Sequence, residues 1–170
     1  GLGTLSTMRI AVFGAGAWGT ALAMAFSRGH DVVLWSRESS EIVALRQDGE
    51  NRRYLPGVPL PANLHFSDDL QQAAQADMHL VVTPLAGLRS TARALRMAAP
   101  ATPLLWACKG LEAGTAKLPH QIVEEELGAD APCGVLTGPS FAAEVAQGLP
   151  AAVTIAARDI EFARHWVQAL

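Results

Sequence analysis

Cysteine is scarce in this chain, with only Cys108 and Cys133 among 170 residues. Two cysteines allow at most one disulfide, which is possible but not needed here. Both lie in apolar, strand-like runs, and we expect them to be small core residues in a reducing cytoplasm. The five histidines have no cysteine or carboxylate at ligand spacing, so the sequence predicts no metal site. His79 falls within an expected strand, as a partly buried core residue.

Long apolar runs and clusters of like charge are also missing. Half of the residues (50%) are hydrophobic, yet no apolar run approaches the ~20 residues that span a bilayer. The 13 lysine and arginine residues are scattered and the formal net charge is −3, which disfavours nucleic acid as a partner. Residues 1–7 lack the features of a signal peptide, and we interpret them as a vector remnant before Met8. The composition favours a cytoplasmic protein with small-molecule ligands.

Short apolar runs alternate with helical patterns along the chain. The expected strands are Arg9–Phe13, Asp31–Trp35, 78–83, 103–107, Cys133–Thr137 and 151–156. The expected helices are the alanine-rich residues 20–28, then 40–47, 85–97 and 117–127, the second ended by Gly49 and the last by Gly128. This alternation predicts one α/β domain, with a doubly wound, mostly parallel sheet covered by helices on both faces.

Two local patterns lie between these elements. Residues 51–64 carry three prolines and no periodicity, so we expect a surface loop there. Ser67 precedes two aspartates and an apolar residue, which predicts that Ser67 is the N-cap of a helix with acidic residues in its first turn.

A glycine-rich segment stands where the first strand gives way to a helix. Gly14-Ala15-Gly16-Ala17-Trp18-Gly19 follows the first strand, and a second strand arrives at the spacing of a βαβ unit. This context is typical of a Rossmann-like, dinucleotide-binding turn, although a purely structural turn is the alternative. Gly14 then permits the tight turn, Gly16 lets a pyrophosphate approach the backbone, and Gly19 lets helix and strand pack closely. The N–H groups of the following helix face the phosphates.

The end of the second strand predicts which dinucleotide is accepted. An Asp or Glu that would bind the ribose 2′-hydroxyl of NAD is expected about 20 residues after the glycines, and Ser36-Arg37 stands there instead. A guanidinium can bind a 2′-phosphate through paired hydrogen bonds, so we expect NADP(H) to be accepted, with NAD(H) also open. The alternative is that Arg37 is a solvated residue paired with Glu38 or Glu41.

Two further segments follow later strands, at the edge where open α/β sheets bind ligands. Lys109 comes directly after an apolar strand and before Gly110, so its ammonium can hold an anionic or carbonyl-bearing substrate. An ordinary loop lysine is the alternative. Gly138 permits close backbone approach, and Ser140 can present its hydroxyl to a ligand, although helix capping alone would explain it.

Five motifs stand in this order: Gly14-Ala15-Gly16-Ala17-Trp18-Gly19-Thr20-Ala21-Leu22-Ala23, Trp35-Ser36-Arg37, Asn51 with Tyr54-Leu55-Pro56-Gly57, Lys109-Gly110-Leu111-Glu112, and Gly138-Pro139-Ser140-Phe141-Ala142. Together, over residues 8–157, they resemble the bacterial-type NAD(P)-dependent glycerol-3-phosphate dehydrogenases. The resemblance implies hydride transfer between NAD(P)H and dihydroxyacetone phosphate, which gives sn-glycerol 3-phosphate for glycerophospholipid synthesis. Leu85 departs from the serine that the family often has there, which affects only a local helix cap.

The glycine turn and the resemblance together assign the site residues. Cofactor contacts are expected from Gly14, Gly16, Ala17, Trp18, Gly19, Ser36, Arg37, Lys109 and Ala142. Substrate contacts are expected from Lys109, Gly138 and Ser140. In the family, a helical second domain carries the general-acid lysine, and no residue here matches it. The catalytic acid is therefore expected downstream, this chain alone is expected to be inactive, and the full-length protein is expected to be a homodimer.

The C-terminal residues show an apolar stripe at helical spacing that stops at Leu170 without a cap. We therefore interpret residues 8–157 as a dinucleotide-binding domain and residues 158–170 as the start of a helix in a chain truncated before its substrate domain. Two alternatives stay open. One is a stand-alone dinucleotide-binding or sensing module, and the other is a β-hydroxyacid-type or ketopantoate-type dehydrogenase with the same glycine turn.

Overall fold

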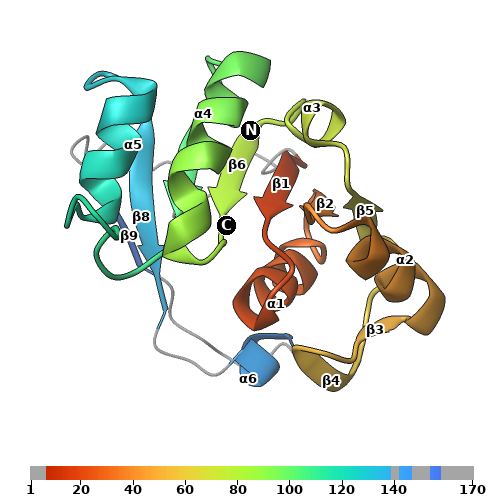
Figure 1. Ribbon diagram of the computed structural model, residues 1–170. Helices are drawn as coiled ribbons and strands as arrows, with labels where there is room; N and C mark the ends of the chain where they lie inside the picture. Colours follow the sequence, from red (N-terminus) through yellow and green to blue (C-terminus); the bar gives the residue numbers. More distant parts are fainter. Residues whose placement is uncertain (1–6, 139–141, 147–153, 158–170) are drawn as a thin grey trace.

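The computed structural model describes residues 7–138, 142–146 and 154–157. Within them, seven strands form one sheet in the order β5-β2-β1-β6-β7-β8-β9 (Figure 1). The strands are β1 (Arg9–Phe13), β2 (Asp31–Trp35), β5 (His65–Ser67), β6 (Met78–Val81), β7 (Leu104–Trp106), β8 (Cys133–Thr137) and β9 (Thr154–Ala156). β9 pairs antiparallel with β8, whereas the other pairs are parallel. The predicted doubly wound, mostly parallel sheet is confirmed.

The strand boundaries follow the sequence pattern closely. β1, β2 and β8 have the predicted limits, while β6 and β7 are shorter than residues 78–83 and 103–107. Residues 151–153 of the last expected strand lie outside the described residues. β5 was not predicted, because three residues at a sheet edge are too short for a readable pattern.

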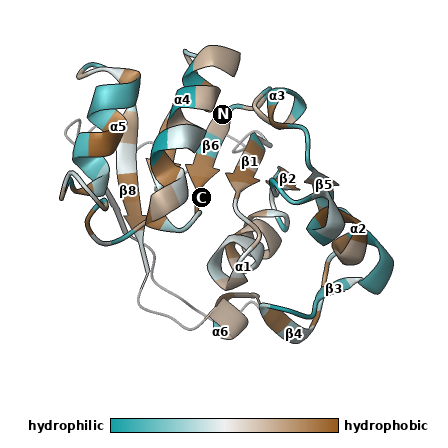
Figure 2. Ribbon diagram, in the orientation of Figure 1, coloured by the Kyte–Doolittle hydropathy of each residue, from teal (hydrophilic) through white to brown (hydrophobic). Residues whose placement is uncertain are grey.

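Side-chain alternation in the central strand explains why helices cover both faces. Ile10 and Val12 belong to one core cluster, whereas Ala11 and Phe13 belong to the other. The first cluster is closed by α1 (Ala17–Phe26), α2 (Ser39–Asp48) and α6 (Ala142–Ala146). The second is closed by α3 (Leu70–Ala73), α4 (Leu88–Ala98) and α5 (Pro119–Leu127). Figure 2 shows the apolar strands between helices that carry hydrophilic residues.

The predicted helices are present with small shifts. α2 extends one residue beyond 40–47 at each end, and Gly49 caps it in the left-handed conformation with φ 65°. α5 starts at Pro119 rather than Lys117, since proline is favoured at a first helical position, and Gly128 is its C-cap. The stretch 85–97 divides into a 3-10 turn, η1 (Leu85–Gly87), and α4.

The predicted N-cap at Ser67 is wrong. Ser67 is the last residue of β5 and pairs with Trp35 of β2, so its backbone is committed to the sheet. Its hydroxyl accepts a hydrogen bond from the Asp69 N–H at 3.0 Å. Asp69 is the N-cap of α3 instead, and its carboxylate accepts from the Gln72 N–H at 3.2 Å.

The predicted surface loop at residues 51–64 is also partly wrong. β3 (Glu50–Asn51) and β4 (Leu55–Pro59) form a two-stranded antiparallel ribbon. Leu55, Val58 and Leu64 are buried against the first core cluster. Prolines obscured this ribbon in the sequence, but a short edge strand tolerates them because few of its N–H groups need partners.

The two cysteines lie in or beside the core as expected, whereas His79 is more deeply buried than predicted. Both cysteines are free thiols, Cys108 buried and Cys133 half-buried. His79 is fully buried, and its Nε2 lies 2.8 Å from the Ala74 carbonyl oxygen. Among the described helices, none has the length and apolar character required to cross a membrane.

Candidate functional site

The candidate site lies at the carboxyl edge of the parallel strands. Three backbone hydrogen bonds join the segments that leave them: Gly14 N–H to Trp35 O at 2.9 Å, Val82 N–H to Phe13 O at 2.8 Å, and Ala107 N–H to Val81 O at 2.9 Å. The exits of β1, β2, β6 and β7 therefore form one connected rim. Sequence-predicted residues follow three of these strands, β1, β2 and β7, and so share this rim.

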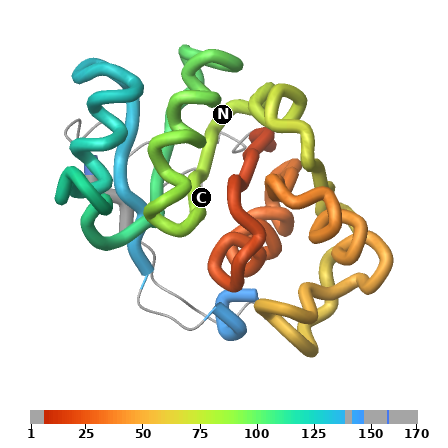
Figure 3. The backbone as a smooth tube through the Cα atoms, in the orientation of Figure 1, coloured from red at the N-terminus to blue at the C-terminus, as the bar shows by residue number. Residues whose placement is uncertain are grey.

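The glycine turn occupies the point where the sheet changes direction. From β1 the chain runs to β2 and β5 on one side, then crosses to β6, β7 and β8 on the other. Figure 3 shows this division by colour, with the orange and yellow segments that follow β1 on one side of it and the later green and cyan strands on the other. Open α/β sheets bind ligands in the crevice at such a switch point.

The three glycines of the turn differ in what a side chain would meet. Gly14 has φ +122°, and a Cβ there would lie 2.8 Å from the Val82 carbonyl oxygen. A Cβ on Gly19 would lie 1.8 Å from the Gly14 carbonyl oxygen, so α1 approaches the turn as closely as predicted. A Cβ on Gly16 would meet nothing within 4 Å. Gly14 and Gly19 are required by the fold, whereas Gly16 faces open space.

The N-terminus of α1 opens onto the same space. Gly16 is its N-cap, no side chain caps the helix, and no acidic residue lies in its first turn. Ala17 and Trp18 form the start of that turn and are partly exposed. Uncapped N–H groups and the helix dipole together favour an anion at this position.

Arg37 and Lys109 stand out among the arginine and lysine residues that the structure describes. They are the two of these whose side chains make neither a hydrogen bond nor an ion pair within the described residues, and both are exposed. Arg37 follows β2 and Lys109 follows β7, so three strand spacings, roughly 14 Å, separate the points where their segments leave the sheet. The predicted alternative, Arg37 paired with Glu38 or Glu41, is not observed.

The Glu41 carboxylate takes other partners. Ser36 is buried and its hydroxyl donates to Glu41 Oε2 at 2.6 Å, while Arg53 Nη1 lies 3.6 Å from Glu41 Oε1. The Arg53 guanidinium stacks over the Tyr54 ring, 4.9 Å from its centroid. The Ser36 hydroxyl is thus committed to a neighbour, and its expected part at the ribose stays a prediction.

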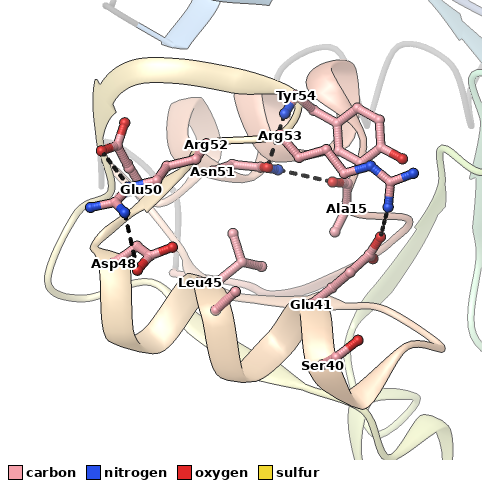
Figure 4. A pocket seen from close by; sticks show the side chains of 11 residues that line it. Ala15, Ser40, Glu41, Leu45, Asp48, Glu50, Asn51, Arg52, Arg53 and Tyr54 are labelled. Carbon is pink, nitrogen blue, oxygen red and sulfur yellow. Dashed lines mark hydrogen bonds and ion pairs between the residues drawn. The ribbon is translucent and has the colours of Figure 1, made fainter.

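A pocket of about 220 Å³ adjoins the turn on this side (Figure 4). It lies between α2 and the segment around the β3–β4 ribbon, and Ala15 of the turn lines it. Its other lining residues are Ser40, Glu41, Ala44, Leu45, Asp48, Glu50, Asn51, Arg52, Arg53 and Tyr54. The charged groups at its walls pair with one another, as the dashed contacts in Figure 4 show for Arg52 and Arg53.

Asn51 is a residue to which sequence reasoning gave no role. Its side chain is buried, and Nδ2 donates to the Ala15 carbonyl oxygen and to the Thr20 hydroxyl, each at 2.9 Å. Its Oδ1 accepts from the Tyr54 N–H at 3.2 Å. Asn51 therefore ties the ribbon to the glycine turn. Its place within a motif was visible in the sequence, but its partner 36 residues away was not.

The last predicted segment is described only in part. Gly138 directly follows β8, as predicted, at the same edge of the sheet as Lys109. Ala142 opens α6, which packs against α1. Ser140 lies outside the described residues. Among the described side chains, no group of three or more His, Cys, Asp or Glu residues is placed to hold a metal ion.

Comparison with known proteins agrees with this geometry. Residues 9–163 match the family model described as "NAD-dependent glycerol-3-phosphate dehydrogenase N-terminus". The chain belongs to this family. A glycerol-3-phosphate dehydrogenase (NAD(P)+) from Aromatoleum aromaticum is 66% identical over 164 residues, which cover 96% of this chain and 50% of that protein. One from Nitrosospira multiformis is 51% identical over 163 residues, which cover 93% of this chain and 49% of that protein.

A solved glycerol-3-phosphate dehydrogenase from Coxiella burnetii has the same fold as this member of the family. Its TM-score is 0.87 at 37% identity, and the match covers 96% of this chain and 51% of that one. The chain therefore spans about half the length of the glycerol-3-phosphate dehydrogenases that it matches. The family match overturns the alternative of a ketopantoate-type or other β-hydroxyacid-type dehydrogenase.

Proposed function

We propose that this chain is the cofactor-binding half of an enzyme that transfers hydride between NAD(P)H and dihydroxyacetone phosphate, giving sn-glycerol 3-phosphate for glycerophospholipid synthesis. Family membership supplies the reaction class. The observation that carries the proposal is that two cations without partners among the described residues, Arg37 and Lys109, flank an open glycine turn on one rim. The phosphates of a dinucleotide and of this substrate are anions that such cations attract.

The residues of the rim fit a bound dinucleotide. The open space at Gly16 and the uncapped start of α1 can receive a pyrophosphate, with Ala17 and Trp18 beside it. Arg37 is the group for a 2′-phosphate, so NADP(H) is accepted as well as NAD(H). When bound, the reduced nicotinamide supplies the hydride.

The substrate side is built from the later strands. Lys109 places an ammonium at the exit of β7, where it stabilises negative charge on the phosphate or on the reacting carbonyl oxygen. Gly138 and Ser140 are proposed to line the substrate site, and Ala142 to touch the cofactor. We assign residues 8–157 to the cofactor domain and the general-acid lysine to the half of the relatives that this chain does not match. The full-length protein is proposed to be a homodimer.

A two-part experiment tests this function. Titrating the 170-residue chain with NADPH should give saturable binding by fluorescence, while dihydroxyacetone phosphate should leave the absorbance of the bound NADPH unchanged. A longer protein that includes the downstream half should oxidise NADPH when dihydroxyacetone phosphate is added, and not when ketopantoate is added. Failure of the chain to bind NADPH would refute the assignment. Steady turnover by the chain alone would show that catalysis does not need the other half, and a longer protein that binds without turnover would favour a sensing module.

A further inference from the structure

Glu112, three residues after Lys109, is held by an arginine from a neighbouring helix. The Arg89 guanidinium donates to the Glu112 carboxylate from Nε at 2.8 Å and from Nη2 at 2.9 Å. The Thr115 hydroxyl donates to the same carboxylate at 2.5 Å. These bonds, those from Arg89 foremost, lower the pKa of Glu112 to about 2. Glu112 is therefore an anchored anion rather than a solvated loop residue.

Arg89 is itself fixed. It is the second residue of α4, whose Leu88 and Leu95 are buried in the second core cluster. Its Nη1 also donates to Glu126 of α5 at 3.2 Å. Because the guanidinium is planar and rigid, its bonds to carboxylates on two different segments fix its orientation. The loop that follows β7 is thus fastened at Glu112 to α4, and Arg89 in turn is bonded to α5.

The backbone of Lys109 lies between two attachments. On one side, the buried Cys108 thiol donates to the Thr83 carbonyl oxygen at 3.2 Å, which ties the chain to the segment after β6. On the other side, Gly110 turns the chain with φ +102°, and Glu112 then reaches Arg89. The Lys109 side chain itself has no partner among the described residues. Its position is therefore set by how its backbone is held.

We propose that Arg89 is a positioning residue that acts through Glu112 to hold the ammonium of Lys109 at the cofactor rim. This inference rests on the proposed function, because it assumes that Lys109 contacts the dinucleotide. A charged side chain contributes most to binding an anion when its position is already fixed in the free protein, because no conformational entropy is then lost on binding. Without the Arg89 fork, the loop from Gly110 onward keeps its local turn but loses its tie to α4, and Lys109 samples more positions.

A double-mutant cycle on the 170-residue chain tests the proposal by NADPH titration. Lys109→Ala should weaken binding, and Arg89→Gln should weaken it by about threefold or more. In a Lys109→Ala background, Arg89→Gln should have almost no further effect, since the residue it positions is gone. Arg89→Lys, which keeps the charge without the fork, should recover part of the affinity. Amide hydrogen exchange around Gly110 should become faster in Arg89→Gln.

Arg93→Gln is the matched control. Arg93 also lies on α4 and donates two hydrogen bonds to Glu126, at 2.9 and 3.0 Å, but it makes no bond to Glu112. It should lower the thermal midpoint about as much as Arg89→Gln while leaving the NADPH affinity unchanged. Independent, additive effects of Arg89→Gln and Lys109→Ala would overturn the proposal, and so would unchanged affinity in either single variant. Absence of NADPH binding by the unmodified chain would instead refute the proposed function.

Discussion

Gly14 and Gly16 are two residues apart, but the surrounding structure gives them opposite tolerance to a methyl group. Gly14→Ala should cost about 1–3 kcal/mol or more of unfolding free energy, because φ +122° is strained for alanine and its Cβ would lie 2.8 Å from a carbonyl oxygen. Gly16→Ala should be neutral to slightly stabilising, since its φ of −76° suits alanine and nothing lies within 4 Å. Urea unfolding measures both changes.

The same Gly16→Ala variant should weaken NADPH binding by about tenfold or more, because its methyl group occupies the space proposed for the pyrophosphate. Gly29→Ala is the control, because a Cβ there also meets nothing within 4 Å, after α1 and away from the rim. It should change neither stability nor affinity. Full NADPH affinity in Gly16→Ala would mean that the phosphates do not approach this part of the turn.

Arg37 is the residue expected to read the 2′-phosphate. Arg37→Asp should cost about 1.5–3 kcal/mol in the free energy of NADPH binding and less for NADH, because the substitution removes a charge-assisted pair and adds repulsion. Stability should stay within about ±0.5 kcal/mol, since Arg37 is exposed and makes no bond within the described residues. Parallel fluorescence titrations with the two cofactors measure the difference. Equal losses would show that Arg37 contacts the adenine without reading the phosphate.

At the scale of elements, the β3–β4 ribbon is fastened to the glycine turn by Asn51. Asn51→Ala should lower the unfolding free energy by about 1–3 kcal/mol, because the buried Ala15 carbonyl and Thr20 hydroxyl lose a donor. NADPH affinity should fall as well, since the ribbon no longer holds the turn. Urea unfolding and cofactor titration give the two readouts.

Asn63→Ala serves as the matched substitution for that experiment. Asn63 also donates from Nδ2 to a backbone carbonyl, that of Ser27 at 2.8 Å, but its side chain is exposed and lies beyond the end of α1 that is remote from the turn. It should cost about 0.5–1.5 kcal/mol of stability and leave NADPH binding unaltered. If both asparagine variants lost affinity equally, the loss would reflect general destabilisation rather than the hold on the turn.

For the whole molecule, we expect stability to fall in acid, and His79 and Glu112 represent the two pH ranges involved. Burial lowers the pKa of His79 below 6.5, so protonation of the unfolded chain reduces stability as pH falls below about 6.5. The pKa of Glu112 is lowered from 4.5 to about 2, so its contribution is present above pH 4.5 and is lost as pH falls toward 2. The unfolding free energy in urea, measured from pH 7.5 to pH 3, should therefore decline in two stages.

Substitutions separate the two stages. His79→Phe should flatten the change between pH 7.5 and 5.5, because the neighbouring Phe13 ring and Ala74 carbonyl carry no titrating group. His120→Phe, at an exposed position of α5, controls for the loss of one histidine. Glu112→Gln should reduce the change below pH 4.5, to which Glu50, Glu125 and Glu126 contribute the rest because their pKa values are also lowered. An unchanged upper stage in His79→Phe would assign that stage to another group.

The sequence by itself determined the layered architecture and the glycine turn. β1, β2 and β8 were readable to the residue, because each is a short, mainly apolar run bounded by polar or turn residues. The placement of Arg37 and Lys109 at one edge of the sheet was predictable, because residues that follow parallel strands share that edge. In each case the signal lies within a few neighbouring residues, where local propensity and periodicity act.

Only the tertiary structure decided which of those residues have partners. The bonds from Asn51 to Ala15 and from Arg89 to Glu112 join residues 36 and 23 positions apart. Ser67 likewise became a strand residue because β2 offered it a pairing edge, which outweighed its preference for a helix cap. Such outcomes depend on which distant segments the folded chain brings together, and a local pattern carries no information about that.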